Sequence, residues 1–213
     1  RMMVDRLADV LYTSEAAADE ILFNEGIPRA RVHCVGNLLV DSLSCARTAM
    51  ASLAATTRDG IQTHASLDRG FGLVSIVKHA NLDERLHFAD VIGVLKLLSR
   101  DLPLIWLLGE RSSYRMQEFQ LARSLEGERI HCLSPRQFPD LVDLIDHATC
   151  VLTDSWGMQD AAASLGVPCL TVGRYAGSAP TLASGANVFV GTNGTAATRA
   201  IWKILYNGGH QSE

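Results

Sequence analysis

The sequence contains no long hydrophobic run and no paired cysteine motif. No apolar stretch approaches the roughly 18 residues that a membrane-spanning helix requires, and no secretory signal is visible. The five cysteines are widely spaced, without a Cys-x-x-Cys pair or a Cys/His cluster. These absences argue against a membrane span, a disulfide framework and a structural zinc site. We therefore expect a cytoplasmic protein with buried free thiols.

Glycine-rich phosphate loops and a strong excess of one charge are also missing. Isolated glycines give neither a Gly-x-Gly-x-x-Gly fingerprint nor a P-loop. The net charge of −4 disfavours nucleic acid or an anionic membrane as the main partner. What the 213 residues do contain is an ordinary globular mixture, 47% hydrophobic and 20% charged. This length and composition predict a real core in one large domain, or in one domain plus a fragment.

Short β-branched runs alternate along the chain with longer segments of helical periodicity. The pattern predicts strands over residues 10–12, 31–35, 71–77, 104–108, 129–133, 150–153, 168–172 and 188–190. Helices are expected after Asn37 and over residues 14–23, 82–98, 112–125, 138–147, 156–165 and 195–206. Repeated strand–helix pairs of this kind predict an α/β fold, with a parallel Rossmann-like sheet that carries helices on both faces.

Two details of this pattern are less regular. Residues 51–70 lose periodicity and are interpreted as a fraying helix end followed by a loop. In the helix expected over residues 82–98, the apolar face is predicted to carry Leu82, Leu86, Ala89, Ile92, Val94 and Leu97.

Ligands of open parallel sheets bind beyond the carboxyl ends of the strands, so three junctions matter: residues 77–81, 108–113 and 153–157. At the last of these, Ser155 opens a helix whose N-terminus suits a phosphate, and Gly157 lets the backbone approach a ligand. The alternative is simple N-capping by Asp154 or Ser155, which requires no ligand.

The other polar segments are open to the same two interpretations. Lys78 and His79 follow a predicted strand and could meet phosphate, or could belong to a polar loop before a helix capped by Asn81 or Asp83. Arg174 follows the strand over residues 168–172 and could cover a ligand, or could lie in an ordinary surface loop.

The order of several motifs resembles the UDP-N-acetylglucosamine 2-epimerase family. Gly36-Asn37-Leu38-Leu39-Val40-Asp41 is similar to the family's Gly-Asn-x-x-x-Asp piece. Thr153-Asp154-Ser155-Trp156-Gly157-Met158-Gln159-Asp160-Ala161-Ala162 resembles Thr-Asp-Ser-Gly-Gly-Ile-Gln-Glu-Glu-Ala. Leu165-Gly166-Val167-Pro168 and Val190-Gly191-Thr192 match later family segments, so the resemblance spans nearly the whole chain.

The resemblance implies a two-domain fold of the glycosyltransferase-B type with the active site between the domains. Residues 1–35 would be a linking segment and the tail of the N-terminal domain, with further sequence expected before Arg1. Residues 36–213 would be the C-terminal domain, which binds UDP or a UDP-sugar without a metal or redox cofactor. Family members interconvert UDP-GlcNAc and UDP-ManNAc by eliminating and re-adding UDP, and a homodimer is possible by the same resemblance.

The residues expected to line the UDP site are Lys78, His79, Phe138, Ser155, Trp156, Gly157, Gln159 and Arg174. Phe138 stands where the family packs the uracil ring. Other motif positions depart from the family: Val77 replaces a histidine, Trp156 a glycine and Ala161 a glutamate that holds the ribose. No catalytic residue is identified in this chain, and the chain alone is expected to be inactive.

Three functions follow from these observations. The first is an epimerase-like enzyme, with an altered substrate, in the complete protein. The second is a catalytically inactive family member that serves as a nucleotide-sugar-binding or protein-interaction module. The third, a stand-alone module of the receiver or flavodoxin kind, ranks last because the signatures of such modules are not evident.

Overall fold

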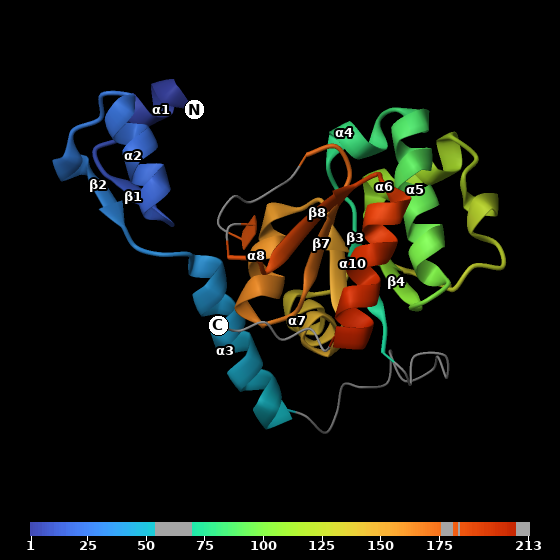
Figure 1. The fold of residues 1–213 in the computed structure, drawn as a ribbon. Coiled ribbons are helices and arrows are strands. Elements are labelled where there is room, and N and C mark those ends of the chain that lie inside the picture. Colours follow the sequence, from blue (N-terminus) through green and yellow to red (C-terminus); the bar gives the residue numbers. More distant parts are fainter. Residues whose placement is uncertain (54–69, 176–180, 183, 208–213) are drawn as a thin grey trace. The chain divides into compact units, whose positions relative to one another are not determined.

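The computed structural model of the protein describes residues 1–53, 70–175, 181–182 and 184–207. It divides the chain into two compact units, Arg1–Cys45 and Ala46–Glu213 (Figure 1). Most of the loop predicted over residues 51–70, and the end of the loop that begins at Arg174, lie outside the described residues.

The first unit is a small parallel β-pair with helices. Strand β1 (Leu11–Thr13) pairs with β2 (Val32–Cys34), and the elements around them are α1 (Met2–Leu7), α2 (Ala16–Asn24) and the short 3-10 turn η1 (Arg29–Arg31). Leu22, Ile27 and Val32 form its small core. The next helix, α3 (Leu38–Leu53), begins as predicted, because the side-chain oxygen of Asn37 accepts a hydrogen bond from the Leu39 amide at 3.0 Å.

The second unit is built on a six-stranded sheet in the order β5-β4-β3-β6-β7-β8, with every neighbouring pair parallel. This sheet confirms the predicted α/β class. Chain order differs from spatial order because each crossover passes over a face of the sheet. The strands are β3 (Gly72–Ser75), β4 (Leu104–Leu107), β5 (Ile130–Leu133), β6 (Cys150–Thr153), β7 (Cys169–Val172) and β8 (Asn187–Gly191).

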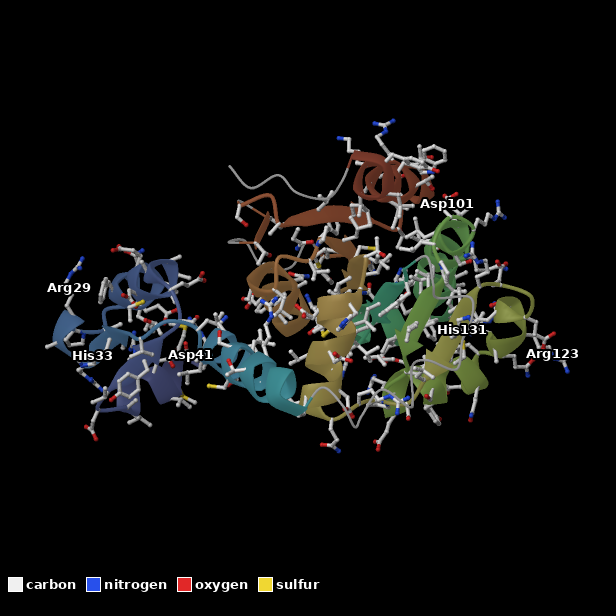
Figure 2. All side chains as sticks on the ribbon, turned by 90° about the horizontal axis from the view of Figure 1, so that it is seen from below. Arg29, His33, Asp41, Asp101, Arg123 and His131 are labelled. Carbon is white, nitrogen blue, oxygen red and sulfur yellow. The ribbon has the colours of Figure 1, made fainter. Side chains whose placement is uncertain are left out.

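Helices cover both faces of this sheet, as Figure 1 shows. Helices α5 (Arg85–Ser99) and α10 (Gly194–Asn207) pack together and share a core with Val74, Trp106 and Leu152. Residues next to these in the strands point the other way, toward the pair α7 (Phe138–His147) and α8 (Trp156–Ser164). The charged side chain of Arg123 points outward into solvent (Figure 2), whereas Asp101, also at the surface, accepts a hydrogen bond from the Trp202 indole at 3.2 Å.

Two predicted helices are shorter than expected. The segment predicted as one helix over 82–98 consists of the short α4 (His79–Leu82) and then α5, which starts only at Arg85. The predicted face was therefore partly wrong: Leu86 and Leu97 are 73% and 38% exposed, whereas Phe88 and Leu95 are buried. The helix predicted over 112–125 ends as α6 (Glu110–Glu118), because Gln120 adopts a φ of 56° before the 3-10 turn η4 (Ala122–Leu125).

The expectation of buried cysteines was correct for only two of the five. Cys150 and Cys169 lie in the buried strands β6 and β7, whereas Cys34, Cys45 and Cys132 are exposed, and all five are free thiols. Burial raises the pKa of Cys150 to about 12, so this thiol stays protonated at neutral pH. In the described part of the chain no helix is long and apolar enough to cross a membrane, and no His/Cys/Asp/Glu group could hold a metal ion.

Gly72 in β3 lies close to side chains of both neighbouring strands, β4 and β6. A Cβ atom there would lie 2.7 Å from Leu104 Cδ2 and 2.9 Å from Leu152 Cδ1. We predict that Gly72→Ala lowers the free energy of unfolding by about 1–3 kcal/mol, the usual cost of overpacking a core. Gly93→Ala is the matched control, because Gly93 lies in α5 with nothing within 4 Å of the added methyl. The control should gain up to about 1 kcal/mol from helix propensity. Urea unfolding of both variants measures the difference, and equal stabilities would contradict the prediction.

Candidate nucleotide-sugar site

A buried carboxylate ties together the carboxyl ends of the central strands. Asp154 directly follows β6, and only 1% of it is exposed. Its Oδ1 accepts a hydrogen bond from the Val77 amide at 2.8 Å, and its Oδ2 accepts one from the Lys78 amide at 2.9 Å. Oδ2 also accepts a hydrogen bond from the Asn81 side chain at 2.7 Å. The segment after β3 is therefore fixed to the end of β6 by three hydrogen bonds.

Asn81 extends this connection to β7. Its side-chain oxygen accepts a hydrogen bond from the Arg174 amide at 3.1 Å. Gly173, just before, has a φ of 113°, and a Cβ on it would lie 2.3 Å from the Asn81 amide nitrogen. Only glycine satisfies both the conformation and the space at this position. Asp154 and Asn81 together thus hold three neighbouring strand ends in one arrangement.

The N-terminus of α8 lies at this edge without a side-chain cap. Ser155 is the N-cap residue, and neither its hydroxyl nor the Asp154 carboxylate bonds to the first helical amides. Instead, Thr153 Oγ1 accepts a hydrogen bond from the Ser155 amide at 3.0 Å and donates one to the Ser75 carbonyl at 2.6 Å. The simple capping role proposed for Asp154 or Ser155 was therefore wrong, because the Asp154 carboxylate is occupied by the segment after β3.

Lys78 and Trp156 meet beside this helix N-terminus. The Lys78 ammonium lies 5.0 Å from the centre of the Trp156 ring, within cation–π distance. Trp156 is 61% exposed, and Gly157 after it is exposed as well. Within the described residues, no carboxylate lies within ion-pair distance of Lys78. The pair therefore presents an aromatic face and an unneutralised cation to solvent.

The other predicted site residues are more scattered. His79 is exposed and lies 3.8 Å from Asp83, and Phe138 begins α7 with 40% of its surface exposed. Gln159 is completely buried in α8. The Arg174 side chain lies 3.3 Å from the His87 ring. The structure thus brings Lys78, Ser155, Trp156, Gly157 and the Arg174 backbone to one edge, and their role in binding stays a prediction.

The third junction, after β4, contains a cluster of ion pairs around Asp83. Arg111 on α6 contacts both Asp83 oxygens at 2.6 Å, and Arg115 contacts the same carboxylate at 3.3 Å. The hydrogen bonds from Arg111 are the largest cause that lowers the pKa of Asp83. This cluster connects α6 to the turn between α4 and α5. Arg111, the arginine within this junction, is therefore already engaged in an ion pair with Asp83.

Sequence reasoning missed the organising role of Asp154, Asn81 and Gly173. It treated Asp154 and Asn81 as capping residues, because Asp and Asn are the residue types found at helix N-termini. The useful signal was the position of Asp154, a carboxylate placed directly after a fully buried strand. A buried carboxylate requires hydrogen-bond donors, and here the segment after the neighbouring strand provides them.

We predict that Asp154→Asn destabilises the protein by about 2–3 kcal/mol. The new amide group places N–H donors opposite the Val77 or Lys78 amides and leaves buried donors without an acceptor. Asp90→Asn is the control, because Asp90 is an exposed carboxylate on α5. It should change stability by less than about 0.5 kcal/mol. Thermal and urea unfolding measure the stability of both variants. An Asp154→Asn protein as stable as the wild type would contradict the structural role of the three Asp154 hydrogen bonds.

The Asp83 cluster gives a prediction for acid pH. The folded-state pKa of Asp83 lies below its ordinary value, so its stabilising contribution is present above the unfolded-state pKa and is lost as pH falls through the folded-state pKa. Arg111→Gln should therefore raise the pKa of Asp83 and bring this loss to a higher pH. NMR titration of the carboxylate measures the change, and an unchanged midpoint would exclude Arg111 as the cause.

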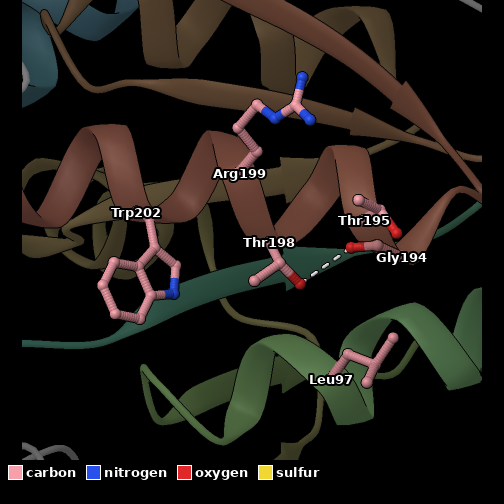
Figure 3. Close-up of a pocket in the computed structure, with 6 residues that line it drawn as sticks. All are labelled: Leu97, Gly194, Thr195, Thr198, Arg199 and Trp202. Atoms are coloured by element: carbon pink, nitrogen blue, oxygen red, sulfur yellow. Dashed lines mark hydrogen bonds between the residues drawn. The ribbon is translucent and has the colours of Figure 1, made fainter.

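A separate groove lies between α5 and α10, and none of the residues predicted to bind UDP lines it (Figure 3). Its volume is about 540 Å³. Thr198 donates a hydrogen bond to the Gly194 carbonyl at 2.9 Å within it. The lining residues are Leu97, Gly194, Thr195, Thr198, Arg199 and Trp202.

The parallel sheet with helices on both faces defines an α/β fold, and its likeness to part of the longer epimerase chains assigns it to the glycosyltransferase-B type. The sequence profile of the UDP-N-acetylglucosamine 2-epimerase family matches residues 1–213. The chain therefore belongs to the UDP-N-acetylglucosamine 2-epimerase family.

Individual relatives agree with this assignment. The UDP-N-acetylglucosamine 2-epimerase of Methanocaldococcus jannaschii is 25% identical over all of this chain and 61% of its own length. The UDP-2,3-diacetamido-2,3-dideoxy-D-glucuronate 2-epimerase of Pseudomonas aeruginosa is 26% identical over 90% of this chain and 51% of its own length. The chain thus spans roughly half to three fifths of these curated relatives.

Solved structures show the same fold. The M. jannaschii epimerase, in complex with UDP-GlcNAc and UDP, aligns with a TM-score of 0.84 at 24% identity, over 99% of this chain and 58% of that one. The Neisseria meningitidis epimerase bound to UDP-GlcNAc aligns with a TM-score of 0.80 at 18% identity, over 98% of this chain and 57% of that one.

Proposed function

We propose that this chain supplies the UDP-binding part of a UDP-N-acetylglucosamine 2-epimerase-like protein. In this proposal residues 36–213 form the C-terminal nucleotide-sugar-binding domain, and residues 1–35 belong to a linking segment and the tail of an N-terminal domain. The complete protein interconverts UDP-GlcNAc and UDP-ManNAc, or a related nucleotide sugar, by eliminating and re-adding UDP. The chain by itself lacks an identified catalytic residue and is expected to be inactive.

The observation that carries the proposal is the meeting of Lys78 and Trp156 beside the uncapped N-terminus of α8. Free amides at a helix N-terminus and a nearby cation favour a diphosphate. The exposed indole face can stack against a base or a sugar ring. The hydrogen bonds of Asp154 to the segment after β3 keep these groups in place before a ligand binds. This reduces the entropy cost of ordering them on binding.

Titration calorimetry on the full-length protein tests whether UDP binds. Lys78→Ala should weaken UDP binding about tenfold or more, because a charge-assisted hydrogen bond to phosphate contributes about 1.5–3 kcal/mol. Lys96→Ala is the matched control. It removes a lysine of α5 that forms an ion pair with Glu128 at 3.3 Å. The control should bind UDP normally. Absence of any heat at millimolar UDP would refute the nucleotide site.

A second candidate function is a catalytically inactive family member that binds nucleotide sugars or a partner protein. The observation that favours it is the apolar Val77, 46% exposed at the end of β3, where the family carries a histidine. Valine neither donates a proton nor binds phosphate. Proton–deuterium exchange at sugar C2 in heavy water separates the two functions. Exchange indicates turnover, and UDP binding without exchange supports the inactive member.

A further inference from the structure

One nitrogen of His87 lies within hydrogen-bond reach of two partners that cannot both bond to it. His87 Nδ1 is 3.3 Å from Nη1 of Arg174 and 3.2 Å from Oε2 of Glu84. Arginine only donates hydrogen bonds, so the contact with Arg174 requires Nδ1 without a proton. The carboxylate of Glu84 only accepts, so the contact with Glu84 requires Nδ1 to carry one. A neutral ring with its proton on Nε2 can therefore hold Arg174, whereas a doubly protonated ring can hold only Glu84.

We propose that His87 is a positioning residue for Arg174, and that it makes nucleotide-sugar binding at the proposed site depend on pH. The proposal rests on the proposed function and on the sequence-based prediction that Arg174 lines the UDP site, with its guanidinium toward the diphosphate. Neutral His87 holds one guanidinium nitrogen of Arg174 and leaves the remaining donors for the ligand. Protonated His87 turns to Glu84 and repels Arg174, so the guanidinium is no longer held.

Only the side chain of Arg174 is released in this step. Its backbone amide stays bonded to Asn81 at 3.1 Å, and Asn81 is fixed by Asp154. The carboxyl edge therefore keeps its shape while one cation changes its freedom. Histidine is suited to this role, since its charge changes between about pH 5 and pH 8.

The charges around His87 come from several elements. Within the described residues, the polar contacts of its ring are with Glu84, before α5, and with Arg174, after β7. Asp90 lies one turn further along α5, and Tyr175 follows Arg174 in the chain. The packed helices carry His79 on α4 and Arg199 and Lys203 on α10, whereas Asp83 is already paired with Arg111 and Arg115.

The first test measures UDP-GlcNAc binding against pH, in the protein at its natural length. UDP-GlcNAc is the probe because both of its phosphates are esterified, so its charge does not change in this pH range. We expect wild-type affinity to fall about two- to tenfold between about pH 8 and pH 5.5, the effect of losing one preorganised side chain. Arg174→Ala should bind weakly at both pH values.

Two variants of His87 make the test specific. Asn places an oxygen near the position of Nδ1 that accepts from Arg174 at every pH, so His87→Asn should keep the high affinity and lose the pH dependence. Phe keeps a ring without nitrogen, so His87→Phe should bind weakly at both pH values. A pH profile in His87→Asn equal to that of the wild type would overturn the proposal.

NMR titration of the His87 ring provides a readout that needs no ligand. Loss of the Arg174 charge favours the protonated ring, so in Arg174→Ala the ring should take up its proton at a higher pH than in the wild type. Loss of the Glu84 charge should have the opposite effect in Glu84→Gln. Identical curves in all three proteins would overturn the His87 proposal even if UDP-GlcNAc binds. Shifted curves without any UDP-GlcNAc binding would leave the two-partner contact standing and refute the proposed function.

Discussion

The arrangement of the candidate site depends on one buried carboxylate. The Asp154 carboxylate accepts hydrogen bonds from two backbone amides and one side-chain amide. These bonds satisfy the carboxylate at a position with almost no access to water. A buried charge without such partners would cost several kcal/mol. Because its donors come from the segment after β3, the pairing of β3 with β6 and the hydrogen bonds of this edge stabilise each other. Asn81 and Gly173 then bring the end of β7 into the same network.

This network separates the structural polar groups from those that are free to bind a ligand. The carboxylate of Asp154 is turned inward, and Asp83 is neutralised by Arg111 and Arg115. Lys78 keeps an unneutralised cation beside Trp156. This arrangement favours the binding of an anion, because the carboxylates of Asp154 and Asp83 are already paired with donors of the protein. Of the three departures from the family motifs, Val77 and Trp156 are exposed to solvent, whereas Ala161 is buried in α8.

Several elements could be predicted because local pattern and tertiary packing agree. Helix α7 and strand β6 have the predicted bounds, since proline and apolar periodicity define one and a short β-branched run the other. The α4–α5 break was not predicted, because Leu82 and Leu86 keep helical spacing on either side of the turn, which is stabilised by the pairing of Asp83 with α6. The exposed Leu86 follows from that break, which changes the phase of the helix relative to the sheet.

The sequence alone determined the α/β class and the resemblance of ordered motifs to a family of nucleotide-sugar epimerases, because periodicity and motif spacing are properties of the chain itself. Tertiary structure decided which polar residues at the strand ends are structural and which face solvent. Asp154, Asn81 and Gly173 meet from three segments that are distant in sequence. A hydrogen bond between such segments depends on strand order and register, and neither quantity can be read from residue types along one chain.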